Sequence, residues 1–376
     1  MTEIFLTIFF ISVLLFFLGS GIWVALSMIG VSAIGMILFT SRPVGDAMAT
    51  TIWGTSSSWT LTALPLFVWM GEILFRTKLS ENLFKGLSPW MQKLPGGLIH
   101  VNVVGCALFA AISGSSAATV ATVGKMSIPE LRKRNYPEKI LLGSLAGSGT
   151  LGLLIPPSII LIIYGVAVQE SIAKLFIAGI IPGIMIALIF MSYVIIWSLI
   201  NKKEMPKILE EYSFLEKIKR SKQLLPVILL ILAVIGSIYT GIATATEAAS
   251  LGVVGALILS YFQKSLTLET FKSSLLGATK TSCMIAFILA GSTFLSLAMG
   301  FTGLPRNLAI WIQNMDLSPY VLIFVLMIFY IILGMFLDGI SAVVLTMAII
   351  EPMIRQAGFD MIWFGIFLVI VVEMAQ

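Results

Sequence analysis

In Thr150-Leu151-Gly152-Leu153-Leu154-Ile155-Pro156-Pro157-Ser158, two adjacent prolines interrupt an apolar run that extends from residue 140 to residue 168. Prolines remove two backbone N–H donors and restrict the residue before them. The carbonyl groups between Gly152 and Ile155 therefore lose helical partners. Inside a bilayer, such carbonyls are tolerated only where protein or a watery cavity surrounds them. The sequence thus predicts a helix that is broken inside the membrane.

Composition indicates the broad class of protein. Of the 376 residues, 59% are hydrophobic and only 11% are charged, and the mean hydropathy is +1.05. About 20 apolar residues are enough to cross a bilayer, so we predict an all-α polytopic membrane protein. The apolar stretches are residues 4–20, 22–39, 61–75, 98–128, 140–168, 172–200, 224–239, 242–262, 283–302, 320–350 and 361–376.

Most of the basic residues lie between these apolar stretches, 19 of the 23 of them in four groups. Basic loops favour the cytoplasmic side of a membrane, so we expect all four groups there and no role in binding nucleic acid. The groups are Arg76, Lys78, Lys85 and Lys93; Lys125, Arg132, Lys133, Arg134 and Lys139; Lys202, Lys203, Lys207, Lys217, Lys219, Arg220 and Lys222; and Lys264, Lys272 and Lys280.

Two apolar stretches of 31 residues predict re-entrant hairpins. Residues 98–128 lie between the first two basic groups, so the chain must cross the membrane there an even number of times, yet the stretch is too short for two full spans. It predicts two half-length helices that meet at Ser113-Gly114-Ser115-Ser116 and enter from the cytoplasm. Residues 320–350 have a polar centre at Asp338-Gly339-Ile340-Ser341 and predict a second hairpin that enters from the outside.

Matching residues recur at a nearly constant spacing along the chain. With five net crossings in each copy, the second copy would be inverted relative to the first, and inverted repeats with broken helices are typical of secondary transporters. The recurring pairs are Gly21 and Gly241, Gly71 and Gly291, the hairpin centres Gly114 and Gly339, and Pro129 and Pro352, which we expect to end the hairpins.

The repeat defines the predicted organisation. Residues 1–200 form the first inverted repeat, with hairpin 98–128 and broken helix 140–168. Residues 201–222 form a basic cytoplasmic linker, and residues 223–376 form the second repeat, with hairpin 320–350. The counterpart of Pro156-Pro157 should fall near positions 379 and 380, so we expect either a second broken helix beyond the given sequence or a protein that lacks it.

Four motifs occur in order: Ser113-Gly114-Ser115-Ser116-Ala117-Ala118-Thr119, the break from Gly152 to Pro157, Gly241-Ile242-Ala243-Thr244-Ala245-Thr246-Glu247-Ala248-Ala249, and Leu337-Asp338-Gly339. Together they resemble the large membrane subunit (DctM type) of tripartite ATP-independent periplasmic (TRAP) transporters over essentially the whole chain. Two features depart from the family pattern. Ala245 stands where proline is common, and the second double proline is absent from the sequence.

The resemblance implies a sodium-coupled symporter of the bacterial inner membrane that works by an elevator motion, with sodium as the coupling ion and no further cofactor. Such a transporter resembles the ion transporter superfamily in fold. Two partners are implied: a small four-helix membrane subunit and a periplasmic binding protein. The latter delivers an organic acid, such as a sialic acid or a C4-dicarboxylate. Because the chain opens with its first span, we expect the small subunit to be a separate chain.

Sodium requires several hard oxygen ligands, which a broken helix next to a hairpin tip can supply at one depth. We also expect Asp338 at mid-membrane to be buried, where a carboxylate without a function is costly. The first sodium is predicted at the carbonyls of Ala110, Gly152, Ile155 and Pro157 with Ser113 or Ser116, and the second at Gly334, Asp338 and Ala375.

The substrate site follows from the half-helices that begin near the hairpin tips. Their N-termini carry free backbone N–H groups and the positive end of the helix dipole, which suit a carboxylate. The predicted substrate contacts are Ser115, Thr150, Asp338 and Ser341.

Plainer readings remain open at each position. Serine and glycine often serve only helix packing, the prolines can produce a simple kink, and Glu247 can cap its helix. Among function classes, an intramembrane enzyme fits poorly because the single histidine, His100, belongs to no HExxH or nucleophile motif. A passive channel is the other alternative, and it would require neither inverted halves nor coupled ion sites.

Overall fold

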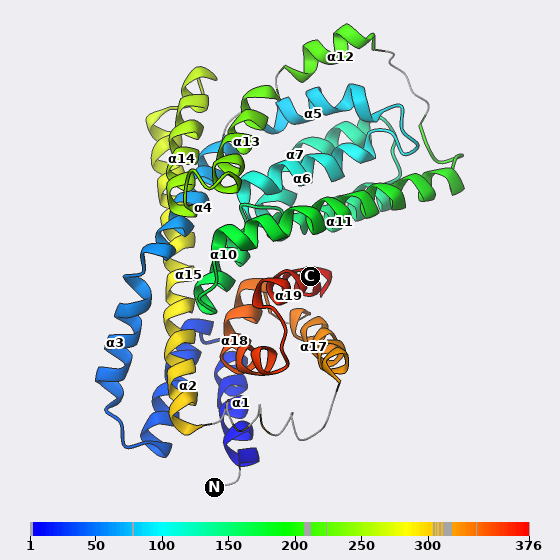
Figure 1. Cartoon of the computed structure of the whole chain (residues 1–376). Coiled ribbons are helices and arrows are strands. Elements are labelled where there is room, and N and C mark those ends of the chain that lie inside the picture. The colour runs from blue at the N-terminus through cyan, green and yellow to red at the C-terminus, as the bar shows by residue number, and fades with distance from the viewer. Residues whose placement is uncertain are drawn as a thin grey trace. The chain divides into compact units, whose positions relative to one another are not determined.

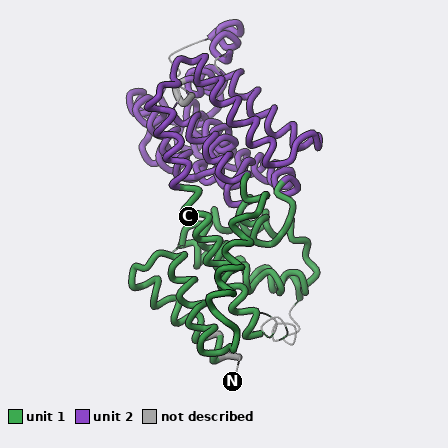
Figure 2. The backbone as a smooth tube through the Cα atoms, turned by 90° about the vertical axis from the view of Figure 1, so that its left-hand side faces the viewer, with its two compact units in different colours: residues 1–62, 162–172, 281–376 green, residues 63–161, 173–280 purple. Residues whose placement is uncertain are grey.

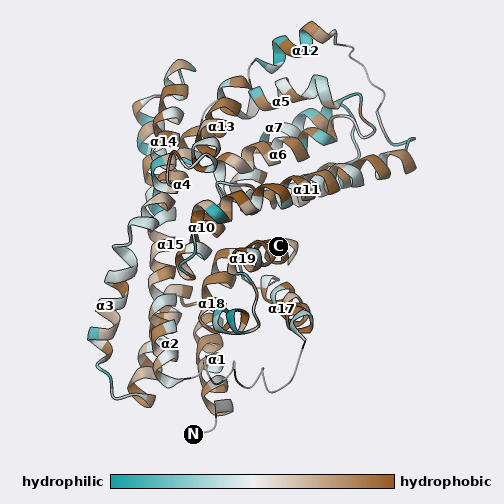
Figure 3. Cartoon of the chain, viewed as in Figure 1, coloured by the Kyte–Doolittle hydropathy of each residue, from teal (hydrophilic) through white to brown (hydrophobic). Residues whose placement is uncertain are grey.

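The computed structural model describes residues 3–76, 79–206, 212–222, 224–303, 305, 307, 310, 318–335 and 337–375. Every regular element within these ranges is a helix (Figure 1). Five of these helices are long and apolar enough to cross a membrane, and up to seven if each bent pair counts as one span. Apolar residues dominate long helices such as α11, as Figure 3 shows. The predicted class, an all-helical multi-pass membrane protein, is confirmed.

The chain forms two compact units, each assembled from separate segments (Figure 2). Unit 1 comprises residues 1–62, 162–172 and 281–376, and unit 2 comprises residues 63–161 and 173–280. Two elements contribute to both units: the short helix α10 (Ile159–Ala167) and the long helix α15 (Leu268–Thr302).

Unit 1 contains the N-terminal helices and the C-terminal hairpin. Its other elements are α1 (Glu3–Gly19), α2 (Val24–Phe39), α3 (Val44–Ser56), the 3-10 helix η1 (Trp59–Thr62), α17 (Pro319–Gly334), α18 (Gly339–Gln356) and α19 (Met361–Ala375).

Unit 2 contains the first hairpin, the broken helix and the helices that enclose them. Its other elements are α4 (Ala63–Phe75), α5 (Leu79–Met91), α6 (Ile99–Ser113), α7 (Ser116–Lys133), α8 (Glu138–Gly149), α9 (Leu151–Leu154), α11 (Ile172–Ile200), α12 (Phe214–Ser221), α13 (Leu225–Tyr239) and α14 (Ala245–Phe262).

The chain breaks where the sequence predicts. Helices α6 and α7 lie side by side and are separated only by Gly114 and Ser115. Helices α17 and α18 are separated by residues 335–338, and α8 to α10 are interrupted at Thr150 and again at residues 155–158.

Three predicted boundaries are wrong. Pro129 and Pro352 do not end the hairpins, because each lies inside a helix that continues for four residues beyond it. The span predicted from residue 283 belongs to α15, which begins at Leu268, since polar residues in its first turns lower the local hydropathy. By contrast, the predicted stretch 61–75 agrees with Trp59–Phe75, the second part of a helix pair that is bent by 54° and begins with α3.

The bounds of the elements recur at the predicted spacing. Helices α7 and α18 both contain 18 residues and begin 223 positions apart, and α8 and α19 also begin 223 positions apart. Two pairs of residues with positive φ match as well: Gly21 with Gly241, at 77° and 72°, and Asn135 with Gly358, at 57° and 81°. The two halves of the sequence therefore place their helix ends at equivalent positions.

Candidate functional site

The tip of the first hairpin is a short turn held by its own hydroxyl groups. Gly114 ends α6 with a φ of 58°, a left-handed conformation that glycine adopts without strain, and its N–H donates to the Ala110 carbonyl. Ser115 begins α7 as its N-cap, because its side chain accepts a hydrogen bond from the Ala118 N–H. The Ser113 hydroxyl lies 2.8 Å from that of Thr119, which donates to the Ser115 carbonyl.

This tip packs directly on the broken helix. A methyl group placed on Gly152 would lie 2.7 Å from the carbonyl oxygen of Ser115 and 2.8 Å from the Ser116 nitrogen. A methyl group on Gly114 would lie 2.9 Å from the Pro157 carbonyl oxygen. Only glycine permits backbone contact this close, so the two glycines join hairpin and break into one structure.

The prolines free carbonyl oxygens at this contact. The helical partners of the Gly152 and Leu153 carbonyls would be the nitrogens of Pro156 and Pro157, which carry no hydrogen. The Ser158 hydroxyl donates to the Leu153 carbonyl and replaces one of these donors. The Gly152 carbonyl is left without its helical donor, and the α-carbon of the same residue packs against the hairpin tip.

One hydroxyl group at the tip is buried without a partner. The Ser116 Oγ atom is enclosed, yet it makes no hydrogen bond to any described residue. Buried polar groups are nearly always satisfied by protein, water or a bound ion, so this oxygen marks a place where a further ligand is expected. The structure thus brings together Ala110, Ser113, Ser116, Gly152 and Pro157, while Ile155, the next residue of the break, adopts an extended conformation.

Histidine, cysteine and carboxylate groups do not cluster near this contact. Within the described part of the chain, no three such side chains are placed to hold a metal ion. The oxygens at the tip are carbonyl and hydroxyl groups instead. Such oxygens favour a hard cation over a transition metal.

The second hairpin, in unit 1, carries the other predicted ion ligands. A methyl group on Gly334 would lie 2.5 Å from the Ala375 side chain, so these two predicted residues are in contact. Asp338 is the N-cap of α18, and its Oδ2 atom accepts the Ser341 N–H at 3.2 Å. Ser341 is buried, but Asp338 is exposed on the surface of this chain, so the expected burial of Asp338 is wrong. Its carboxylate caps the helix at the surface of this chain, where no neighbouring element covers it among the described residues.

Other polar residues considered above have local partners. The Thr150 hydroxyl donates to the Gly147 carbonyl at 2.8 Å. Glu247 forms a capping box with Thr244 at the start of α14, which is the plainer of its two readings. His100 is buried at the base of the hairpin, 2.8 Å from the Pro95 carbonyl.

Sequence reasoning missed the helix that supports the break. Methyl groups on Gly179 and Gly183 of α11 would lie 3.0 Å from the Leu154 carbonyl and 2.8 Å from the Ile155 side chain. The small-xxx-small spacing of these glycines signals close packing but does not name the partner. Gly71 of α4 was also missed as a site residue, and it faces the Ile112 carbonyl at 3.0 Å in the same way.

Comparison with known proteins gives a consistent result. Residues 9–376 match the family described as tripartite ATP-independent periplasmic transporter, DctM component. A C4-dicarboxylate TRAP transporter large permease protein of Pseudomonas aeruginosa is 32% identical over 346 residues, which cover 92% of this chain and 80% of the relative.

Two further relatives carry different substrate names. A sialic acid TRAP transporter large permease protein of Vibrio cholerae is 31% identical, covering 93% of this chain and 81% of the relative. A 2,3-diketo-L-gulonate TRAP transporter large permease protein of Escherichia coli is 31% identical, covering 86% of this chain and 76% of the relative.

Proposed function

This chain belongs to the DctM component family of tripartite ATP-independent periplasmic transporters, and we propose that it is the sodium-coupled permease subunit through which an organic acid enters the cell. As a member of this family it is a membrane transport protein and not an enzyme. The proposal concerns the coupling ion, the substrate class and the movement of the site-bearing elements.

The contact between hairpin tip and broken helix carries the proposal of sodium coupling. Gly152, whose carbonyl lacks its helical donor, packs against a tip whose Ser116 hydroxyl has no partner among the described residues, and this arrangement supports a cation site. Oxygen ligands without net charge suit a monovalent cation better than a divalent one. We assign the first sodium to this place, with Ala110, Ser113, Ile155 and Pro157 as the further predicted ligands.

The second sodium is assigned to the other hairpin by the recurrence of helix ends. Ser115 and Asp338 are the N-caps of α7 and α18 and stand 223 positions apart, so the two tips are equivalent in the two halves. Gly334 and Ala375 meet beside the second tip. This equivalence supports a repeat of the two halves. We propose that the second half is inverted in the membrane relative to the first.

Re-entrant hairpins imply how such sites are reached. A helix of 15 residues, such as α6, is about 22 Å long and falls short of a hydrocarbon core about 30 Å thick. The tips would therefore lie within the membrane and be reached from one side at a time. Movement of the site-bearing elements past a fixed scaffold, an elevator motion, provides that alternation.

The names of the relatives support an acidic substrate. Relatives of this chain are named for C4-dicarboxylates, sialic acid, 2,3-diketo-L-gulonate and isethionate, which are all organic acids. The last, from Oleidesulfovibrio alaskensis, is 29% identical and is named DctMQ. We propose a carboxylate held at the helix N-termini near Ser115 and Ser341, delivered in the inner membrane of a bacterium by a periplasmic binding protein together with a small membrane subunit.

Reconstitution tests this function. The complete transporter in proteoliposomes, supplied with its binding protein and a labelled organic acid, should accumulate the acid only when an inward sodium gradient is present. Replacing sodium with potassium should abolish accumulation. Equilibration of the acid without any gradient would indicate a passive channel and contradict the proposal.

A further inference from the structure

Unit 2 contains a cavity of about 1100 Å³ away from the contact between hairpin and break. It is bounded by residues of α4, α5, α7, α12 and the first turns of α15. A volume of this size accommodates a small organic molecule or a lipid headgroup. The cavity plays no part in the ion sites assigned above.

The cavity wall carries an excess of positive charge. Among the lining side chains that the structure describes, five are basic (Arg76, Lys85, Lys125, Arg134 and Arg220) and two are acidic (Glu130 and Glu269). Glu72 lies behind the wall and pairs with Arg76. Counting this carboxylate too, the described basic side chains still outnumber the described acidic ones, which favours an anion.

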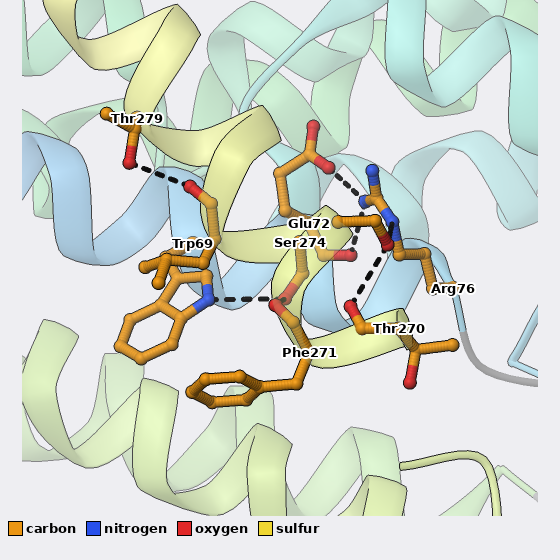
Figure 4. Close-up of polar contacts among 9 residues, drawn as sticks. Trp69, Glu72, Arg76, Thr270, Phe271, Ser274 and Thr279 are labelled. Carbon is orange, nitrogen blue, oxygen red and sulfur yellow. Dashed lines mark hydrogen bonds and ion pairs between the residues drawn. The ribbon is translucent and has the colours of Figure 1, made fainter. Parts of the chain in front are cut away.

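Arg76 is held in a fixed position on this wall (Figure 4). Its Nη1 atom is paired with the Glu72 carboxylate and donates to the Glu72 carbonyl at 2.9 Å, while its Nε atom donates to Ser273 Oγ at 2.9 Å. On the adjoining turn, Trp69 Nε1 donates to Ser274 Oγ at 3.3 Å, which ties α4 to α15. A methyl group on Gly277 would lie 2.7 Å from the Glu72 carboxylate, so glycine at this position makes room for the ion pair.

Residues of α7 also line the cavity. Thr122 is only 5% exposed, and its Oγ1 atom makes no hydrogen bond within the described part of the chain. Lys125 stands one turn further along α7 and is exposed. The Lys125 ammonium group, and not the enclosed Thr122 hydroxyl, is therefore the donor of α7 that a ligand in the cavity can reach, and a cationic donor favours an anion.

We propose that this cavity is an anion-binding site, held by Lys125, Arg76 and Arg220. Tyr212 orients Arg220, because its hydroxyl accepts from the Arg220 Nη1 atom at 3.1 Å and its ring lies 4.2 Å from the guanidinium carbon. Phosphate and dicarboxylate groups share the required chemistry. The source is either a soluble anion or an anionic lipid headgroup, and the two are separable by experiment.

The position of the cavity indicates a role after substrate release from the hairpin tip. This role rests on the proposed function. Thr122 lies seven residues after Ser115 on α7, about 10 Å along the helix from the hairpin tip. The basic groups that line the cavity are those assigned to the cytoplasm. An acid leaving the tip would therefore meet this site before it reaches the cytoplasm.

The charge of the cavity is measurable with thiol reagents of opposite charge. The experiment uses the full chain in phosphatidylcholine vesicles, with Cys106 and Cys283 replaced by alanine and the lining residue Met126 replaced by cysteine. The measured quantity is the rate of reaction with a negatively charged methanethiosulfonate divided by the rate with a positively charged one. At position 126 this ratio should be about tenfold higher than at Gly143→Cys. Gly143 is an exposed position on α8 with open space around it. Adding Lys125→Gln should lower the ratio, whereas Lys133→Gln on the same helix, outside the cavity, should not.

Occupancy is measured in the same vesicles. Millimolar inorganic phosphate should slow labelling at position 126 and leave position 143 unaffected, which would identify a soluble anion as occupant. Protection that appears without phosphate, once phosphatidylglycerol is included, would identify a lipid headgroup. Equal rates for both reagents, without protection by phosphate or phosphatidylglycerol, would overturn the proposal. Because no uptake is measured, a failure of sodium-driven transport leaves this test unaffected.

Discussion

The α-carbon of Gly152 faces the carbonyl group of Ser115 so closely that a single methyl group would stand 2.7 Å from both its carbon and its oxygen. Gly152 belongs to the broken helix and Ser115 to the hairpin tip, 37 residues earlier. Backbone on both sides of the contact leaves no flexible side chain to move aside. The contact is therefore a sensitive point at which to test the proposed ion site.

Replacing Gly152 with alanine should separate the tip from the break. Overpacking of this kind costs about 1–3 kcal/mol, and the displaced carbonyl would no longer reach a shared ion. We expect sodium-dependent thermal stabilisation in detergent to disappear and sodium-driven uptake to fall by at least about tenfold. Gly143→Ala on the neighbouring helix α8 is the matched control, since nothing lies within 4 Å of its added methyl group. Equal behaviour of the two variants would refute the assignment.

Replacing Ser116 with alanine should weaken sodium binding without destabilising the protein. Its hydroxyl makes no hydrogen bond to described residues, so no protein contact is lost. The expected result is an unchanged melting temperature without sodium and a higher sodium concentration for half-maximal stabilisation. Ser113→Ala, which removes the contact with Thr119, should by contrast lower the melting temperature in both conditions. An unaltered sodium titration for Ser116→Ala would remove Ser116 from the ligand set.

Asp338 has two separable contributions, a helix cap and a charge. Asp338→Ala removes both, and loss of the cap alone costs about 1 kcal/mol. Asp338→Asn keeps a good N-cap and removes only the charge. If Asp338 binds sodium, both variants should lose sodium-driven uptake while remaining in the membrane. Normal uptake by the asparagine variant would show that Asp338 only caps α18.

Tyr136 closes the base of the first hairpin, where its hydroxyl accepts the Leu98 N–H at 3.0 Å. Tyr136→Phe would leave that donor unpaired at a cost of about 1–3 kcal/mol, measurable as a lower melting temperature and faster hydrogen exchange at Leu98.

Burial raises the pKa of Tyr136 above its usual value, and the bond to Leu98 opposes this rise. Because the pKa of Tyr136 is higher in the folded state than in the unfolded chain, its neutral phenol contributes stability that is present below about pH 10. This contribution is lost as the pH rises further. The phenylalanine variant should lack that alkaline loss.

The proposed topology is testable by labelling from each side of the membrane. Lys219→Cys on α12 should react only from the cytoplasm, and Thr240→Cys, beyond the single span α13, only from the outside. Both positions are exposed. Cys283 must first be replaced because it too is exposed. Reaction of both cysteines from the same side would contradict the topology.

The sequence revealed features that depend on local chemistry. Gly114 and the proline pair break the helix by themselves, because their conformational preferences do not depend on distant partners. The recurrence of Gly21 and Gly241 likewise located equivalent helix ends in both halves of the chain, whereas the recurring prolines Pro129 and Pro352 lie inside helices. These features were sufficient to place the hairpins and the break.

Features that depend on tertiary contacts were not predictable in the same way. Helix α3 and the first turns of α15 contain enough threonine, serine and charge to escape a search for apolar stretches. The exposure of Asp338 and the packing of Gly179 are set by neighbours that a single sequence does not reveal. The basic cavity likewise brings together side chains from five separate elements.

The glycines of α11 have a consequence for how the ion site can be observed. Gly179 packs on the backbone of the break and Gly183 on the Ile155 side chain, while Ile181 and Ile184 on the same helix are exposed, at 77% and 54%. A rigid contact on one face transmits displacement to the other. A spin label or fluorophore attached at these isoleucines should therefore report occupancy of the proposed cation site without any alteration of its proposed ligands.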